Sequence, residues 1–130
     1  MLPSFSIPPI GPRQGKVWGT TQLIFAYNGV EAHRINVMAH GHCSVHYHRH
    51  KWNRFVVLRG RLTICIRYEN GMVDDTVLTV GMITDVPPMV EHWFRANEDT
   101  EALELYWVEL EAGDIERDVE HLGGVLNAGD

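Results

Sequence analysis

The chain has 130 residues, a length that fits one domain, and 45% of them are apolar, so we expect a folded protein rather than a disordered one. Eleven basic residues against 17 acidic ones give a net charge of −6. Nucleic acids and anionic membranes both attract positive charge, so this balance argues against either as a partner.

The first residues differ in character from the rest. Four prolines interrupt residues 1–12, and this stretch lacks the charged and continuous apolar regions of a signal peptide. We expect residues 1–15 to form an extended arm, either a loose tail or a strap across a partner subunit, and residues 16–130 to form a single domain. The two cysteines, Cys43 and Cys65, fit buried free thiols, and we expect a cytoplasmic protein.

Short apolar runs broken by turn residues follow from Lys16 onward. Asn28-Gly29 and Asn70-Gly71 are preferred hairpin turns, and Gly60 and Gly81 also break the pattern. About eight strands at regular spacing are typical of an all-β sandwich or barrel. The expected strands are Val17–Ala26, Val30–Ala39, Cys43–His50, Asn53–Arg59, Arg61–Tyr68, Met72–Val80, Val90–Ala96 and Ala102–Leu110.

One helical segment is predicted near the end of the chain. Asp114 can cap its start, and Gly123 can end it. Ile115, Val119 and Leu122 fall on one helical face between these two residues. The sequence therefore predicts a β-barrel followed by a short C-terminal helix.

Five of the eight histidines lie within residues 40–50. Residues two apart in a strand point to the same face, so His46, His48 and His50 would share one side. Imidazoles on one strand bind a metal ion when a second strand adds a ligand, and His92 is the candidate. His50 could be a fourth ligand, a substrate contact or a rim residue, with the rim favoured. We expect His33, His40 and His42 to face solvent.

Two stretches resemble the paired motifs of the cupins. Gly41–Gly60 reads GHCSVHYHRHKWNRFVVLRG, with His-x-His followed by a glycine, and Gly81–Asn97 reads GMITDVPPMVEHWFRAN, with the late histidine. The resemblance comes closest to the cupin domain of type II mannose-6-phosphate isomerases and mannose-1-phosphate guanylyltransferases. It implies a double-stranded β-helix, a jelly-roll-like barrel, around one divalent metal ion.

The motifs depart from the family pattern at three positions. Asn53 stands where the family has a glutamate ligand, Met89 replaces a glycine, and Gly41 precedes His46 by one residue fewer than usual. The implied metal set is therefore His46, His48, Asn53 and His92. An amide oxygen brings no negative charge, so this set should bind its ion less tightly, and it suits zinc, iron, manganese, nickel or cobalt.

The resemblance also suggests where a small-molecule ligand would bind. Arginine can clamp a phosphate, and aromatic residues at a barrel mouth would make an apolar pocket. The expected substrate pocket contains His50, Arg54, Phe55, Phe94 and Tyr106. No catalytic residue is assigned, because the pattern does not establish whether Glu104 and Tyr106 face inward.

Three functions remain open at this point. One is an isomerase-like, metal-dependent enzyme that acts on a sugar phosphate or a similar small polar metabolite. The second is a non-catalytic cupin module that binds a small molecule, and the third is a mainly structural or interaction protein that uses the barrel surface. Cupin relatives commonly pair through their outer sheets, so we expect a homodimer.

Overall fold

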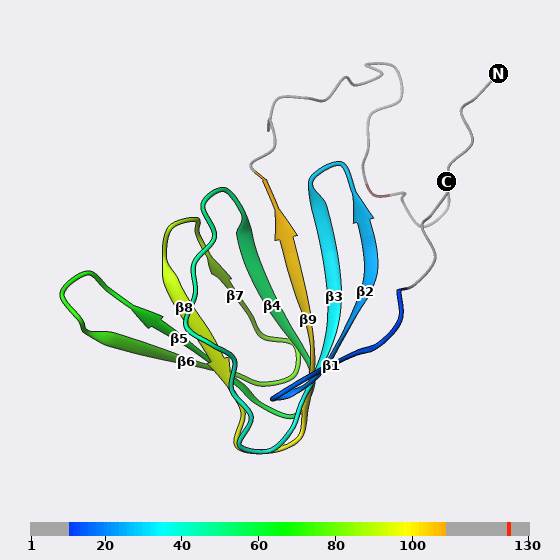
Figure 1. Ribbon diagram of the computed structural model, residues 1–130, viewed down its shortest axis with the longest axis horizontal. Helices are drawn as coiled ribbons and strands as arrows, with labels where there is room; N and C mark the ends of the chain where they lie inside the picture. The colour runs from blue at the N-terminus through cyan, green and yellow to red at the C-terminus, as the bar shows by residue number, and fades with distance from the viewer. Residues whose placement is uncertain (1–10, 109–124, 126–130) are drawn as a thin grey trace.

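The computed structural model describes residues 11–108 and residue 125 as an all-β protein. A six-stranded sheet has the order β1-β2-β3-β9-β4-β7, a three-stranded sheet has the order β6-β5-β8, and every pairing is antiparallel. Figure 1 shows the strands fanning out from one end of the molecule. The strands are β1 (Gln14–Lys16), β2 (Gly19–Tyr27), β3 (Val30–Val37), β4 (Trp52–Arg59), β5 (Leu62–Arg67), β6 (Val73–Leu78), β7 (Ile83–Val86), β8 (Glu91–Arg95) and β9 (Thr100–Trp107).

The predicted all-β class is confirmed, and the described residues contain no helix. The helix expected between Asp114 and Gly123 lies outside the described part of the chain. Within that part, no helix is long and apolar enough to cross a membrane.

The predicted hairpins form where the turn residues allow a left-handed backbone. Asn28 and Gly29 have φ of 46° and 80° between β2 and β3, as a two-residue hairpin of the mirror-image type requires. Gly71, with φ of 85°, turns the chain between β5 and β6. These turns fix the strand register and hence which side chains face the interior.

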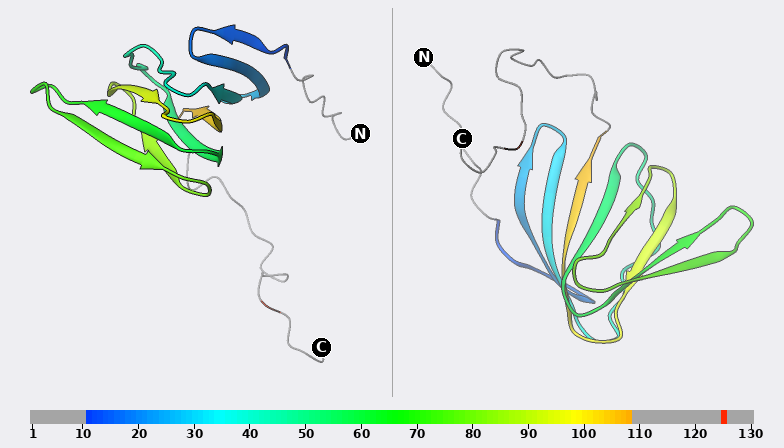
Figure 2. Two further views of the ribbon diagram at one scale, coloured as in Figure 1. Left: turned by 90° about the horizontal axis from the view of Figure 1, so that it is seen from below. Right: turned by 180° about the vertical axis from the view of Figure 1, so that it is seen from behind.

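The apolar core lies between the two sheets, whose strands the left view of Figure 2 shows from below. Alternate residues of each strand point into it, as the buried–half-buried alternation of β4 shows. The six-stranded sheet contributes Ile35, Val37, Phe55, Val57, Val86 and Ala102, and the smaller sheet contributes Leu62, Ile64, Leu78 and Phe94. This core holds the two sheets together below the histidine cluster.

The segment Cys43–His50 is not the regular strand that alternation predicted. It runs beside β8, and the pairing here consists of two isolated bridges, His42–Arg95 just before the segment and His46–His92 within it, with single backbone hydrogen bonds from Cys43 N to the Phe94 carbonyl oxygen and from Met89 N to the His48 carbonyl oxygen. His42 and His46 are four residues apart, whereas their partners Arg95 and His92 are three apart. One extra residue on this segment therefore interrupts the ladder, as in a β-bulge. The segment still presents His46 and His48 beside His92.

Two short strands were not predicted. β7 has four residues, Ile83–Val86, confined between Gly81 and the pair Pro87-Pro88, and the sequence indicated only a turn there. β1, Gln14–Lys16, pairs with β2 and includes the last residues of the expected arm. Both are edge strands of the six-stranded sheet.

Candidate metal centre

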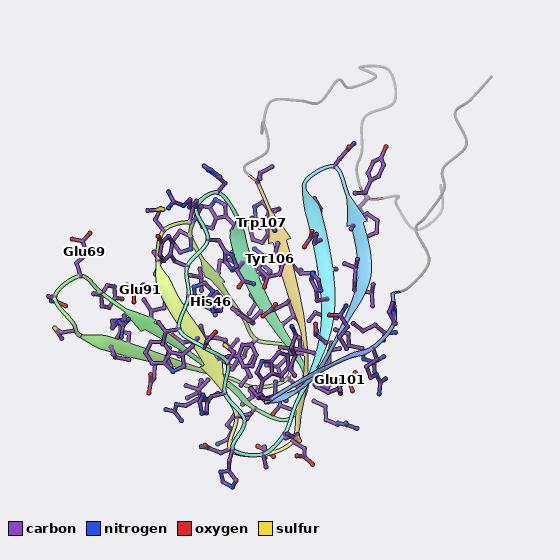
Figure 3. All side chains as sticks on the ribbon, viewed as in Figure 1. His46, Glu69, Glu91, Glu101, Tyr106 and Trp107 are labelled. Atoms are coloured by element: carbon purple, nitrogen blue, oxygen red, sulfur yellow. The ribbon has the colours of Figure 1, made fainter. Side chains whose placement is uncertain are left out.

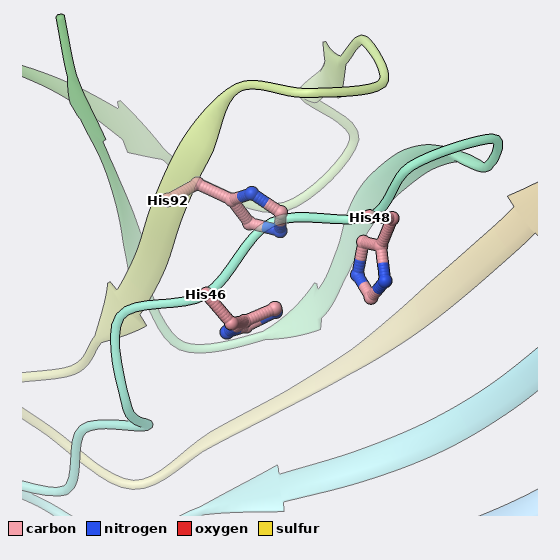
Figure 4. Close-up of side chains that lie close together, drawn as sticks. All are labelled: His46, His48 and His92. Carbon is pink, nitrogen blue, oxygen red and sulfur yellow. The ribbon is translucent and has the colours of Figure 1, made fainter. Parts of the chain in front are cut away.

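Three histidine rings from two distant parts of the chain meet at one point between the sheets, as Figure 4 shows. His46 and His48 come from the segment that precedes β4, and His92 comes from β8. Their ring centroids are 4.4 to 5.4 Å apart, and one ligand nitrogen from each lies within 4.8 Å of the other two. This group could hold one metal ion.

Backbone carbonyl groups orient two of the rings. His46 Nδ1 lies 2.7 Å from the Ser44 carbonyl oxygen, and His92 Nδ1 lies 2.9 Å from the Val90 carbonyl oxygen. A carbonyl oxygen only accepts hydrogen bonds, so each Nδ1 carries the proton and donates it. Each Nε2 is then left with a free lone pair, and a second hydrogen bond of this kind typically orients a metal-binding histidine.

The Nε2 atoms of His48 and His92 receive no hydrogen bond from a donor group among the described residues. His48 Nε2 is buried and has no hydrogen-bond partner among the described residues. His92 Nε2 faces Asn53 Oδ1 at 3.2 Å, which sets two lone pairs against each other when Nδ1 of the ring carries the proton. Ligands about 2.1 Å from one metal ion lie about 3 Å apart, so a cation bound to both atoms would satisfy them. The residues therefore fit a bound metal ion.

Burial also keeps two of the rings ready for metal. Desolvation lowers the pKa of His92 to about 4 and lowers the pKa of His48 as well. Both imidazoles are therefore neutral at pH 7, and metal binding there does not have to displace a proton from either Nε2. The buried Asn53 side chain, 0% exposed, donates from Nδ2 to the Leu105 carbonyl oxygen and so directs Oδ1 toward His92.

A cavity of about 710 Å³ opens beside the histidines. This volume is within the range of sites for small metabolites. Apolar side chains such as Trp18, Leu23 and Phe94 line part of it. The polar side chains that line the cavity are Gln14, Lys16, Thr21, Glu31, His33, Ser44, His46, His48, Lys51, Glu104 and Tyr106.

Glu104 is a buried carboxyl group in the wall of this cavity. Desolvation raises its pKa, and a hydrogen bond from Tyr106, whose Oη lies 2.5 Å from Glu104 Oε2, acts in the opposite direction. Figure 3 shows Tyr106 beside Trp107 near the end of β9. The structure thus settles the orientation of the last strand, with Glu104 and Tyr106 facing inward.

The register of the large sheet explains how these polar groups gather. Tyr106 lies opposite Glu31 on β3 and opposite Asn53 on β4. Glu104 lies opposite His33 in the next inward-facing row. His33 therefore faces the cavity, not solvent as the sequence suggested, and it packs edge-on against Tyr106 at 5.6 Å.

The residues expected in a substrate pocket lie in different places. Phe94 and Tyr106 line the cavity, whereas Phe55 is fully buried beneath it, 6.4 Å from the His92 ring. His50 is exposed and does not line the cavity. Arg54 points to the outer face, because alternation places its neighbours Asn53 and Phe55 inside, and it binds Asp85 at 2.7 and 2.8 Å.

Comparisons with known proteins agree with this architecture. Residues 33–109 match the model of the family described as the cupin domain. No curated protein sequence matches the chain. Oxalate decarboxylase from Bacillus subtilis, in a structure determined at pH 4.6, has a TM-score of 0.67 at 13% identity, over 75% of this chain and 27% of that one.

Two further solved structures are similar. KdgF from Halomonas sp. has a TM-score of 0.66 at 15% identity, over 77% of this chain and 88% of that one. An oxalate decarboxylase from Bacillus subtilis studied for its Mn(II) centres has a TM-score of 0.68 at 14% identity, over 86% of this chain and 30% of that one. The chain thus spans less than a third of the oxalate decarboxylases it resembles, and at these identities the likeness shows the fold alone.

Proposed function

Because this chain belongs to the cupin family, we propose that it binds one divalent metal ion and moves a proton within a small polar metabolite held beside that ion. His46, His48 and His92 would hold the ion through their Nε2 atoms, with Asn53 Oδ1 as the fourth ligand. When bound, the ion would polarise a carbonyl or hydroxyl oxygen of the ligand. Zinc, iron, manganese, nickel and cobalt all suit imidazole and amide ligands.

The observation that carries the proposal is the buried carboxyl group of Glu104 in the cavity that His46 and His48 also line. Isomerisation of a sugar needs a group that takes a proton from one carbon and returns it to the next. A carboxyl group whose pKa is raised by burial holds a proton more readily than a free one, which suits a group that both accepts and returns it. Tyr106 holds Oε2 by its hydrogen bond, so Oε1 is the oxygen available to a ligand.

The substrate class is a small polar metabolite, and the motif resemblance favours a sugar phosphate. Arginine is not the group that would bind the phosphate, because none of the described arginines lines the cavity, and five of them pair with acidic residues outside it. The pairs are Arg34 and Arg59 with Glu101, Arg54 with Asp85, Arg67 with Glu91, and Arg95 with Asp75. Any anionic group of the substrate would meet the lysines of the cavity instead.

Proton exchange with solvent tests the proposal even while the complete reaction is unidentified. The metal-loaded protein is incubated in deuterated buffer with a panel of sugar phosphates, free sugars and hydroxy acids, and loss of a carbon-bound proton signal is followed by NMR. We expect exchange for at least one compound and none with Glu104→Gln, whose metal content stays at one ion per chain. Tyr106→Phe removes the hydrogen bond that lowers the pKa of Glu104, so its exchange profile should move to higher pH.

The second candidate is a non-catalytic binding module. Asn53 favours it, because an amide in place of a carboxylate leaves the full charge of the ion uncompensated and suits capture of a ligand. Binding of a panel compound to the metal-loaded protein, with no exchange in any case, would replace the enzyme proposal with this one.

We also propose that the protein forms a homodimer. Two apolar side chains that share a face of β2, beyond the part that β1 covers, are exposed, with Tyr27 61% and Phe25 38% exposed. Burial of such a group between two copies would be favourable. Light scattering at micromolar concentration should return twice the mass of the chain, and a mass of 14.8 kDa would contradict the proposal.

A further inference from the structure

Lys51 places a positive charge at the cavity wall. Its ammonium group lies 5.4 Å from the centre of the Tyr106 ring, a cation–π distance, and 4.0 Å from Glu31 Oε2. The second distance is too long for a hydrogen bond, and Glu31 Oε2 lies closer to His33 Nε2, at 3.2 Å. The ring and the carboxylate therefore position the ammonium while its three donors stay available.

The ammonium lies near the metal centre as well. The centre of the Tyr106 ring lies 5.1 Å from the centre of the His48 ring and 5.4 Å from Lys51 Nζ. The distance from Lys51 Nζ to the His48 ring is therefore at most the sum of these two distances. One small molecule that contacts a metal ion on His48 could therefore also reach Lys51.

The charge of the cavity favours an anion. Its charged lining residues are Lys16, Lys51, Glu31 and Glu104, and burial opposes ionisation of Glu104. A divalent ion on the histidines would make the total clearly positive, although the whole chain has a net charge of −6. A ligand with a negative group is therefore attracted into a local positive field.

We propose that the ligand of this site carries an oxygen donor for the metal at one end and an anionic group, a carboxylate or a phosphate, that pairs with Lys51 at the other. The inference rests on the proposed metal centre and goes beyond it by naming the chemical class of the ligand and the side chain that selects it. Neutral sugars, which offer only the oxygen donor, would bind more weakly.

Matched pairs of small acids test this. The protein is loaded with Co²⁺, and its visible absorption is titrated with malate against lactate, and with 3-phosphoglycerate against glycerate. Each pair shares a hydroxy-acid group that can bind the metal, and only the first member carries a second anionic group. The titrations are repeated on Lys51→Gln, on Lys51→Arg, and on Arg59→Gln, which changes a cation that does not line this cavity.

We expect malate or 3-phosphoglycerate to bind about tenfold more tightly than its partner, as one charge-assisted hydrogen bond allows. Lys51→Gln should abolish that preference without changing lactate or glycerate affinity, and Lys51→Arg should retain much of it. Whichever of malate and 3-phosphoglycerate shows the larger preference over its partner identifies a carboxylate or a phosphate as the preferred group. A preference that survives Lys51→Gln, or that is lost in Arg59→Gln, would overturn the inference while the metal centre stands. Failure to bind Co²⁺ at all would instead overturn the metal centre itself.

Discussion

Asn53 Oδ1 and His92 Nε2 face each other at 3.2 Å in the interior of the barrel, and no proton is available to join them. The proton of the His92 ring is on Nδ1, where the Val90 carbonyl oxygen accepts it. Two buried acceptors in contact destabilise the metal-free protein, because neither is compensated for the loss of water. A cation is the simplest partner that both atoms can share.

The first prediction concerns the charge of this ligand set. Asn53→Glu adds a carboxylate next to His92, so metal affinity should rise at least about tenfold, because opposite charges attract strongly where water is excluded. Without metal, the same carboxylate would be buried beside neutral groups, and the free energy of unfolding should fall by about 1–3 kcal/mol. Chelator competition and urea unfolding, each with and without metal, measure the two effects.

Asn53→Gln is the matched control, since it adds the same length without the charge. Its metal affinity should stay at or below that of the natural chain. Equal gains in affinity for the glutamate and glutamine variants would mean that reach, and not charge, limits binding at this position.

The second prediction separates His48 from the exposed histidines near it. His48→Ala should lower metal affinity at least about 100-fold, because it removes one of three imidazoles that meet at the site. The ring has no hydrogen-bond partner at Nε2 among the described residues, so its loss breaks no such bond in the metal-free protein. His42→Ala, at an exposed position outside the cluster, is the control, and its metal content should stay near one ion per chain.

The third prediction is an acid sensitivity of the metal-free protein. Burial lowers the pKa of His92 from 6.5 to about 4 in the folded chain, so between these values the unfolded chain binds a proton that the folded chain does not. The contribution of His92 to the free energy of unfolding is therefore fully present above pH 6.5. It is lost as the pH falls from 6.5 to about 4, and the loss reaches about 3 kcal/mol. Urea unfolding at a series of pH values with a chelator present measures this.

Two variants show whether His92 is the source. His92→Phe should flatten the decline between pH 6.5 and 4, whatever its effect on stability at pH 7. Ile64→Val, a buried change that carries no titrating group, should lower stability by a similar amount at every pH. A decline of unchanged steepness in His92→Phe would assign the acid sensitivity to other residues.

The His-x-His spacing and the late histidine were sufficient to predict from the sequence that His46, His48 and His92 would meet in a group that could hold a metal ion. Residues two apart in an extended segment share a face even when the ladder is irregular, so His46 and His48 meet although Cys43–His50 is not a regular strand. The two hairpin turns at Asn-Gly likewise predicted the neighbouring strands, because few residues tolerate that backbone.

The inner wall of the cavity could not be predicted in the same way. On β9 the inward positions are Glu104 and Tyr106, and the outward ones include Leu103 and Leu105. This order reverses the usual rule that apolar residues point inward, so hydrophobic alternation gave no reliable orientation for the strand. Such reversals are expected where a fold gives up stability for a binding site. Pairing across the sheet, which places Glu104 opposite His33, is what reveals the wall.

The last prediction tests the glycine that ends the first motif. Gly60 turns the chain between β4 and β5 with φ of 89°, and a Cβ there would lie 2.6 Å from both the Asp99 carbonyl oxygen and Thr100 Oγ1. Gly71 has nearly the same φ, 85°, but nothing lies within 4 Å of its Cβ position. Gly71→Ala should therefore cost only the left-handed backbone strain, about 1 kcal/mol, whereas Gly60→Ala should cost about 3 kcal/mol or more, because Thr100 Oγ1 also bonds the backbone of Arg61. Thermal and urea unfolding compare the two, and equal losses would show that backbone conformation alone, without the close contact to Thr100, requires glycine at position 60.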